Sequence, residues 1–352
     1  MKQIRKANLF LLFVICVFVG GSFGLAWLFK RVDVSYNLSV MSGQILIGFS
    51  LIIYLLVTKT NPIKVFRDSR LGIVDILLVV LLMFLMLPMV YFINYLSMFF
   101  TENTTAATIS GMMDNPYMLN LLMLAVTPAI LEELVCRGVL FHAYKKKNLL
   151  AAILLTAFIF GLLHMNLNQM LYAGVIGIAF AVAVEATGSI YSSMIMHFIM
   201  NSISVTALAF LKFVKNLGIY PEEMFEAEMQ QVQAGVEVAM PTIMTVALIL
   251  VAFMVVVAST ALAVGVIILL AKRSGRTENL KEMFKKPSKS KRRSLQQIKA
   301  QLEAVGEIPV TEEIATESEG ETEIVCDEAE ERIMDIPFKL AVVIALAVMI
   351  WL

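Results

Sequence analysis

Long apolar runs are the feature that most constrains what this chain can fold into. A hydrocarbon core of ~30 Å takes ~20 residues of α-helix to cross, and eight runs reach about that length. They are residues 7–29, 40–57, 72–97, 117–144, 149–168, 170–187, 189–212 and 241–271. Hydrophobic residues make up 59% of the 352-residue chain and charged residues only 16%, which excludes an ordinary soluble protein. The expected fold class is an all-α, polytopic membrane helical bundle of about eight transmembrane helices.

Basic residues predict the orientation of these helices. They cluster before the first run and after the second, fourth and eighth runs, all of which fall on one side of the membrane. The alternate loops 98–116 and 213–240 are predominantly acidic. Because short cytoplasmic loops are rich in lysine and arginine, we expect a multi-pass protein of the cell membrane with a cytoplasmic amino terminus. Lys30 and Arg31, in the first outer loop, are the one counter-signal.

The end of the chain has a different composition. Residues 272–337 carry a basic stretch and then an acidic one, which predicts a cytoplasmic, disordered tail. Its basic part, 285–293, suits contact with anionic lipid headgroups. A last apolar segment, 338–352, is short for a span, and it either tilts the local bilayer, lies in the interface or is a truncated span. We expect a lipid-bilayer environment and no nucleic-acid partner.

Ionisable groups inside spans are candidates for function because each is costly to hold in lipid. Here they gather on three of the apolar runs: Glu132, Glu133 and Arg137 on one, His164 on the next, and His197 with Asn201 on a third. At 1.5 Å per residue, Glu132, His164 and Asn201 come out ~20 to ~24 Å from the same membrane face, and His197 ~14 Å. The spacing therefore predicts one shared level near the middle of the membrane.

Three interpretations of this set stay open. Glu133 and Arg137, one helical turn apart, could neutralise each other while histidine and asparagine join helices by hydrogen bonds. A glutamate could instead take a proton from water and return it to a leaving amine, with His197 and Asn201 donating hydrogen bonds to the oxyanion. In the third interpretation, Glu132, His164 and His197 bind zinc and leave its fourth position open. His142, close to Lys145, is interpreted as an interfacial residue.

Three short motifs in this region resemble a known family. "EELVCR" is similar to an EExxxR motif, "FGLLH" to FxxxH and "HFIMN" to HxxxN, in the order found in the CPBP intramembrane proteases, also called the Abi or type II CAAX prenyl protease family. The resemblance covers roughly residues 117–207 and is of the bacterial type. Cys136 stands where many relatives carry a bulkier residue, and we expect it to alter packing and not chemistry.

The resemblance implies roles for the same six residues. Glu132 would be the general base that activates water, Glu133 and Arg137 its supporting pair, and His164 a second catalytic group. His197 and Asn201 would form the oxyanion site. The family has been described both as glutamate-dependent and as metal-dependent. We favour the glutamate mechanism, which requires no cofactor, with zinc as the alternative.

The function expected from the sequence is an intramembrane endopeptidase that cleaves a membrane-embedded or membrane-delivered peptide. The alternatives are a catalytically silent scaffold or bacteriocin-immunity protein that binds a peptide in the same cavity, and a proton-coupled transporter that uses Glu132 and His164 as a relay. The sequence leaves the oligomeric state open. The expected organisation is N-terminal helices 1–116, a protease-like core 117–212, an outer loop 213–240, a helix 241–271, the tail 272–337 and the apolar end 338–352.

Overall fold

The structure is a computed structural model that describes residues 3–60, 70–101, 108–219, 242–284 and 333–351, with positions 221, 223, 224 and 227. Within these residues the chain forms helices and no β-strand, so the all-α prediction is confirmed. Most of the loop 213–240 and of the tail 272–337, including the basic segment 285–293, lies outside the described residues.

Seven helices of the described part are long and apolar enough to cross a membrane. Six are single α-helices: α1 (Gln3–Phe29), α2 (Tyr36–Thr58), α4 (Ile73–Ser97), α10 (Leu167–Thr187), α11 (Ile190–Asn216) and α13 (Thr242–Arg273). The seventh, Tyr117–Tyr144, joins α6 (Tyr117–Leu121), α7 (Thr127–Glu133) and α8 (His142–Tyr144) through two π-helical stretches, η1 (Leu122–Val126) and η2 (Leu134–Phe141). The chain is thus a multi-pass membrane protein.

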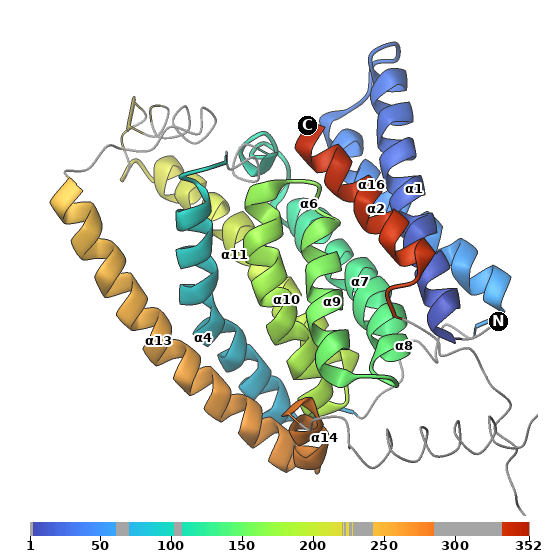
Figure 1. The fold of residues 1–352 in the computed structure, drawn as a ribbon. Helices are drawn as coiled ribbons and strands as arrows, with labels where there is room; N and C mark the ends of the chain where they lie inside the picture. The colour runs from blue at the N-terminus through green and yellow to red at the C-terminus, as the bar shows by residue number, and fades with distance from the viewer. Residues whose placement is uncertain are drawn as a thin grey trace, which may run out of the picture.

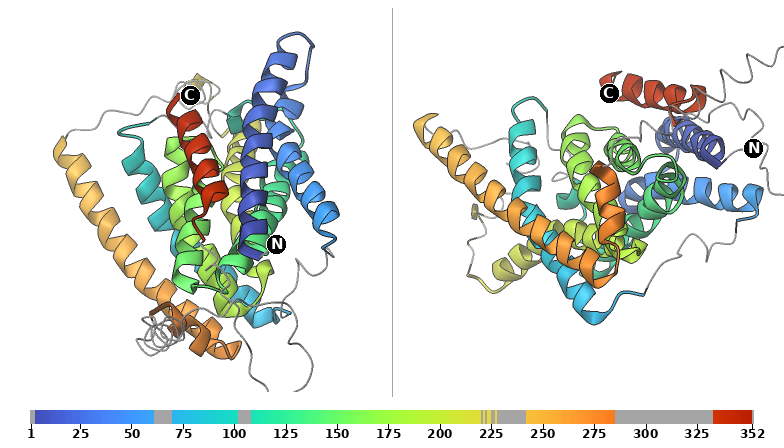
Figure 2. Two further views of the ribbon diagram at one scale, coloured as in Figure 1. Left: turned by 45° about the vertical axis from the view of Figure 1, so that its right-hand side comes forward. Right: turned by 60° about the horizontal axis from the view of Figure 1, so that its bottom comes forward.

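The helices form a bundle around α10 and its neighbour α9 (Leu149–Leu162). Figure 1 shows α4 and α13 on one side of this pair and α7, α2, α1 and α16 (Ile336–Trp351) on the other. The views in Figure 2 agree that α16 lies against α1. Pro88 lies inside α4 and withholds one backbone hydrogen-bond donor from that helix. The bundle surface facing outward is rich in exposed apolar side chains, as a lipid-facing surface must be.

Helix α9 is shorter than the sequence suggests. A span was expected over 149–168, but the helix ends at Leu162 after 14 residues, ~21 Å of rise. Met165 has a positive φ of 49°, and the Asn166 side chain then accepts a hydrogen bond from the Gln169 amide to cap α10. These local turn and cap interactions end the helix where the polar residues His164, Asn166 and Asn168 interrupt the apolar run. The turn between α9 and α10 carries His164, which is why this side chain faces the interior of the bundle.

Close packing of α9 against α10 depends on small residues. A Cβ atom built on Gly161 would lie 2.5 Å from the Met170 carbonyl oxygen, and one on Gly177 would lie 3.1 Å from Ala157 Cα. Helices in lipid associate mainly through such close backbone approach, since burial of apolar surface gives little driving force there. The spacing of these two helices is therefore set by residues without large side chains.

Gly161→Ala is expected to lower the free energy of unfolding by about 1–3 kcal/mol, because the added methyl meets backbone that cannot rotate away. Thermal or denaturant unfolding of the purified protein in detergent measures the change. Gly265→Ala in α13 is the matched control, since a Cβ there meets nothing within 4 Å. Equal stability of the two variants would contradict the packing argument.

The carboxylate of Glu185, at the end of α10, links three segments of the chain by hydrogen bonds. Glu185 is buried and accepts hydrogen bonds from Lys145 Nζ at 3.2 Å and from Arg276 Nη2 at 2.5 Å. Asn279, in α14 (Thr277–Lys281), adds a bond of 3.3 Å to the same carboxylate. These contacts hold the segment after α13 under the α9–α10 pair.

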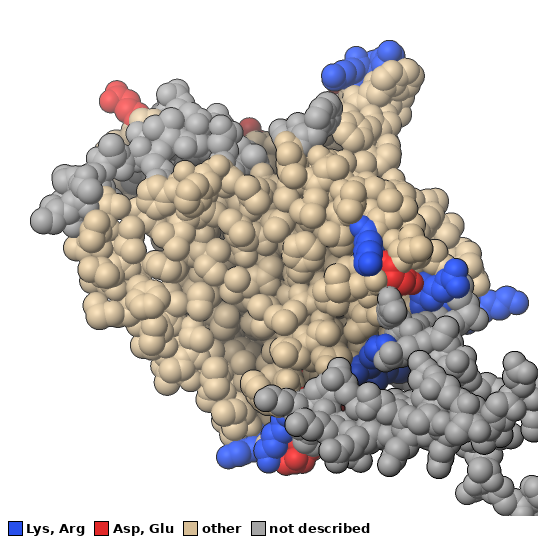
Figure 3. All heavy atoms as spheres, in the orientation of Figure 1, with Lys and Arg blue, Asp and Glu red and all other residues tan. Residues whose placement is uncertain are grey.

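Figure 3 shows the face of the molecule that is turned to the viewer in Figure 1. A broad band without charge crosses this face, and most of the charged side chains lie at the rims of the band.

The apolar C-terminal segment forms α16, a helix of 16 residues. Tyr144 Oη donates to Asn8 Oδ1 at 2.6 Å, and Asn8 Nδ2 donates to the Ile333 carbonyl at 2.8 Å. Phe338 and Ala341 are buried in the same region. The start of α16 is therefore tied to both α1 and the end of α8.

Candidate active site

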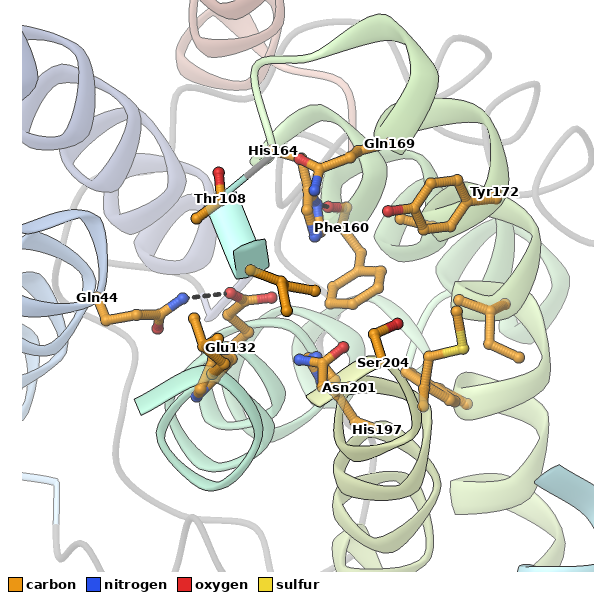
Figure 4. Close-up of a pocket in the computed structure, with 17 residues that line it drawn as sticks. Gln44, Thr108, Glu132, Phe160, His164, Gln169, Tyr172, His197, Asn201 and Ser204 are labelled. Atoms are coloured by element: carbon orange, nitrogen blue, oxygen red, sulfur yellow. Dashed lines mark hydrogen bonds between the residues drawn. The ribbon is translucent and has the colours of Figure 1, made fainter. Parts of the chain in front are cut away.

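A cavity of about 280 Å³ lies inside the bundle between α2, α7, α9, α10 and α11. Its wall includes four of the six candidate residues: Glu132, His164, His197 and Asn201. Figure 4 shows Glu132 of α7 and His164 of the turn between α9 and α10 with their polar ends toward the same space. The remaining two candidates, Glu133 and Arg137, lie behind this wall and are fully buried. The equal-depth argument thus grouped residues that the fold does bring together.

Adjacent glutamates point in different directions because successive residues of a helix are about 100° apart around its axis. Glu132 faces the cavity, and its Oε1 accepts a 2.6 Å hydrogen bond from Gln44 Nε2 of α2. Its Oε2 is buried without a hydrogen-bond partner among the described residues. One oxygen is therefore anchored and the other is left for a small polar molecule in the cavity.

Glu133 faces the packed interior and belongs to a separate ionic network. Its Oε1 accepts from Arg137 Nη1 at 2.9 Å and contacts His197 Nδ1 at 3.1 Å. Arg137 Nη2 also donates to the Gly177 carbonyl at 2.9 Å. A buried charge needs a partner of opposite charge and hydrogen bonds to remain in a protein interior. This network supplies the opposite charge and the hydrogen bonds to Oε1, whereas Glu133 Oε2 and Arg137 Nε are buried with no hydrogen-bond partner among the described residues. The direct effect of this network is to fix the orientation of the His197 ring.

Two aromatic rings complete the surroundings of Arg137. The guanidinium carbon lies 4.6 Å from the ring centre of Phe160 and 5.3 Å from that of Phe180. The same two rings enclose His197, which is stacked on Phe180 and meets Phe160 edge-on. Cation–π contacts of this kind strengthen when water is excluded. The FxxxH phenylalanine therefore packs against both the ionic network and His197.

Side-chain contacts accompany both π-helical stretches, η1 before α7 and η2 after it. Pro128 has no N–H and cannot donate to the preceding turn, and Thr127 Oγ1 donates to the Leu122 carbonyl five residues back at 2.9 Å. At the other end, His142 Nδ1 lies 2.6 Å from the Arg137 carbonyl, again five residues back. Such wide turns are found often at functional sites. His142 is engaged with this backbone and does not line the cavity.

The tautomer of His164 follows from its one backbone contact. Nδ1 lies 2.9 Å from the Phe160 carbonyl oxygen, and a carbonyl can only accept, so Nδ1 carries a proton. In the neutral ring, Nε2 is then an acceptor. His164 lines the cavity, so it can accept a hydrogen bond from a molecule held there.

His197 and Asn201 lie one turn apart on α11 and share the cavity wall with Ser204. Because the Glu133 carboxylate accepts, His197 Nδ1 carries a proton, and the remaining Nε2 is not engaged by Glu133. Asn201 offers two N–H donors from its amide. The α11 side of the cavity can therefore supply donors, whereas the Glu132 side supplies acceptors.

Zinc was the alternative cofactor expected from the sequence, with Glu132, His164 and His197 as ligands. Among the described residues there is no group of three His, Cys, Asp or Glu side chains placed to hold a metal ion. A zinc site of the expected type needs three such ligands at about 2 Å from the ion. The residues as arranged do not fit that site.

The cavity wall has polar residues that the sequence argument did not name, and Gln44 is the one that contacts Glu132. Gln44 lies on α2, well before the three motifs, and contacts Glu132 across 88 positions of the chain. A polar amide inside an otherwise apolar span was the available signal, since polar groups in membrane helices mark contacts or function. Nothing in the spacing of the motifs connects position 44 to them.

Comparison with known proteins agrees with the motifs. Residues 114–203 match the family model described as "Type II CAAX prenyl endopeptidase Rce1-like". This segment is an Rce1-like domain of the CPBP family. A relative in Bacillus subtilis (strain 168), named "Putative membrane peptidase YdiL", is 33% identical over 82 residues, or 23% of this chain. These residues span 34% of that relative, about a third of its length. No solved structure matches the chain.

The Rce1-like segment contains most of the cavity but not all of it. It includes Glu132, His164, His197 and Asn201, as well as the buried Glu133 and Arg137. Residues of the wall outside the segment are Gln44, Thr108, Ile109 and Ser204. Cys136, the departure noted in the first motif, is fully buried beside the network. Part of the site environment is therefore supplied by the surrounding helices of this chain.

Proposed function

We propose that the protein is an intramembrane endopeptidase that hydrolyses a peptide bond of a membrane-embedded or membrane-delivered peptide. The observation that carries the proposal is the cavity in which one oxygen of Glu132 is anchored while its other oxygen has no described partner. The Rce1-like match over residues 114–203 supports the same class of activity. We propose that the protein resides in the cell membrane with its amino terminus in the cytoplasm.

In the proposed first step, water enters the cavity and donates one hydrogen bond to Glu132 Oε2 and one to His164 Nε2. In this proposal Glu132 is ionised, so that Oε2 accepts, and the contact of His164 Nδ1 with the Phe160 carbonyl leaves Nε2 of the neutral ring as an acceptor. Glu132 takes a proton as the water oxygen bonds to the carbonyl carbon of the substrate. A base held in this way contributes about 10²–10⁴-fold to a rate.

In the second step, charge develops on the carbonyl oxygen, and donors on α11 stabilise it. In this proposal the donors are Asn201 and its neighbour in the cavity wall, His197, whose ring contacts Glu133. Donors fixed before the reaction stabilise an oxyanion strongly because they need no reorganisation. The C–N bond then breaks, and protonated Glu132 returns its proton to the leaving amine. The products are one new carboxylic acid and one new amine, which become a carboxylate and an ammonium group when the remaining proton moves to the amine. Side chains and water suffice for each step.

Hydrolysis by water is tested with the full chain, purified and reconstituted into lipid nanodiscs. A library of membrane-inserted peptides is incubated in H₂¹⁸O, and the products are sequenced by mass spectrometry. We expect cleavage products whose new carboxyl termini carry one ¹⁸O atom. Empty nanodiscs are the control, and the absence of products that depend on the protein would contradict the proposal.

The same assay separates the glutamate and zinc mechanisms. We expect cleavage to survive a metal chelator within about twofold, since the proposed steps use only side-chain acid–base chemistry. Bound zinc is measured in the same preparation by elemental analysis. Loss of cleavage on chelation with recovery on adding zinc would replace the glutamate mechanism by a metal-dependent one.

A further inference from the structure

Helix α2 lies outside the Rce1-like segment but packs directly on the helix that carries Glu132. Ile47 and Leu51 are buried, and a Cβ atom on Gly48 would lie 3.4 Å from Leu131 Cδ1. Gln44, Ile47, Gly48 and Leu51 follow the i, i+3, i+4, i+7 spacing of one helix face. The face of α2 that meets α7 is therefore the face that carries Gln44.

The contact between Gln44 and Glu132 is short and directional. Gln44 Nε2 donates to Glu132 Oε1 across 2.6 Å, a distance typical of hydrogen bonds to a charged acceptor. Figure 4 shows the Gln44 side chain reaching from α2 toward the carboxylate at the edge of the cavity. A carboxylate with one oxygen held in this way loses most of its rotational freedom, so the other oxygen has a defined direction.

Other polar groups near Glu132 do not duplicate this support. Arg137 bonds to Glu133 and to the Gly177 carbonyl, and His197 contacts Glu133. The family resemblance implies that Glu133 and Arg137 are a supporting pair for Glu132. Among the described residues, the hydrogen bond to the Glu132 carboxylate comes from Gln44. The family motif residues thus fix His197, and the base itself is held from another helix.

The hydrogen bonding of the Gln44 amide is also unusual for a buried polar group in a membrane helix. Its Oε1 is buried without a hydrogen-bond partner among the described residues, and a buried polar atom without a partner costs free energy. An amide that served only to join helices would be expected to satisfy both its ends. Here the donor end alone is used, and it is used on the proposed base.

From these contacts we infer that Gln44 is the positioning residue for Glu132: its amide holds the carboxylate so that Oε2 faces the cavity. The inference rests on the proposed function for its catalytic consequence, but the contact itself can be tested without any substrate. Gln44 acts through Glu132 and is not a catalytic residue. Because a displacement of about 1 Å at a reacting group can cost ~10²-fold in rate, loss of this anchor is expected to act on kcat.

The first arm of the test is a double-variant cycle on stability. Wild type, Gln44→Met, Glu132→Met and the double variant are unfolded in detergent, and the coupling between the two positions is calculated. Methionine at position 132 removes the acceptor of the hydrogen bond, and methionine at position 44 removes its donor. Methionine keeps the length of glutamine but cannot donate. We expect the two positions to be coupled by about 10-fold or more in the unfolding equilibrium constant, as for a hydrogen bond to a charged group. Independent effects of the two substitutions would overturn the inference.

The second arm measures kcat and KM on a peptide that the wild type cleaves. Gln44→Met is expected to lower kcat by about 10- to 100-fold with KM within about threefold. Ser42→Ala is the matched control on the same helix, because Ser42 Oγ bonds to the Ser39 carbonyl and does not line the cavity. Unchanged kcat in Gln44→Met, or an equal fall in Ser42→Ala, would overturn the positioning role.

The stability cycle and the kinetic measurement can give different outcomes, and each outcome bears on a different claim. If the wild type cleaves no peptide while the stability cycle shows coupling, the proposed function is contradicted and the anchoring of Glu132 by Gln44 is supported. If the wild type cleaves and the coupling is absent, the proposed function stands and the inference about Gln44 is overturned.

Discussion

Glu132→Gln is expected to lower kcat for peptide cleavage by about 10²–10⁴-fold, the usual contribution of a general base. The change keeps the size of the side chain and leaves an oxygen that can still accept from Gln44 Nε2. What it removes is the ability of the second oxygen to take a proton from water. The measurement is the rate of product formation by purified protein in nanodiscs, with substrate above KM.

Two comparisons make this result interpretable. The unfolding temperature of Glu132→Gln should stay close to that of the wild type, because the variant keeps its volume and its anchored oxygen. Glu282→Gln makes the same chemical change at an exposed position outside the cavity and should cleave at the wild-type rate. Cleavage by Glu132→Gln within about threefold of wild type would leave general-base catalysis by this residue untenable.

Arg137→Met is expected to lower the free energy of unfolding by about 3–5 kcal/mol, the cost of leaving a buried charge without its partner. The guanidinium is fully buried and donates to both Glu133 and the Gly177 carbonyl. It also lies over the rings of Phe160 and Phe180. Unfolding by denaturant in detergent, together with the yield of folded protein, measures the loss.

The double variant Glu133→Gln/Arg137→Met separates charge burial from packing. Removing both members of a buried ion pair is typically far less costly than removing one, so we expect the double variant to be more stable than Arg137→Met alone. A loss below about 1 kcal/mol in the single variant would mean that the pair behaves like an exposed one. That outcome would contradict the buried network.

The sequence was informative about this site because the relevant groups are rare in a membrane span. Glu132, His164, His197 and Asn201 could be placed at one level from helix rise alone, and the cavity wall includes all four. The periodicity of a helix also predicted the pairing of Glu133 with Arg137 one turn away. Their roles in catalysis are still predictions, which the kinetic experiments above address.

Other features were out of reach of sequence reasoning. The end of α9 at Leu162 is decided by the turn at Met165 and the Asn166 cap. Polar residues mark this part of the sequence, but they do not fix the residue at which the helix ends. The contact of His197 with Glu133 joins residues 64 positions apart, and that of Gln44 with Glu132 joins residues 88 positions apart. Spacing along one helix carries no information on such pairs.

By itself, the sequence determined that the chain forms a membrane helical bundle, and it determined which helices carry the ionisable groups. The reason is that lipid imposes a fixed length and an apolar composition on every span, and both can be read directly. Only the tertiary structure decided that Glu132 faces the cavity, that Glu133 is committed to Arg137 and His197, and that Gln44 anchors Glu132. These depend on how each helix is rotated against its neighbours, which is set by close packing at residues such as Gly161 and Gly177.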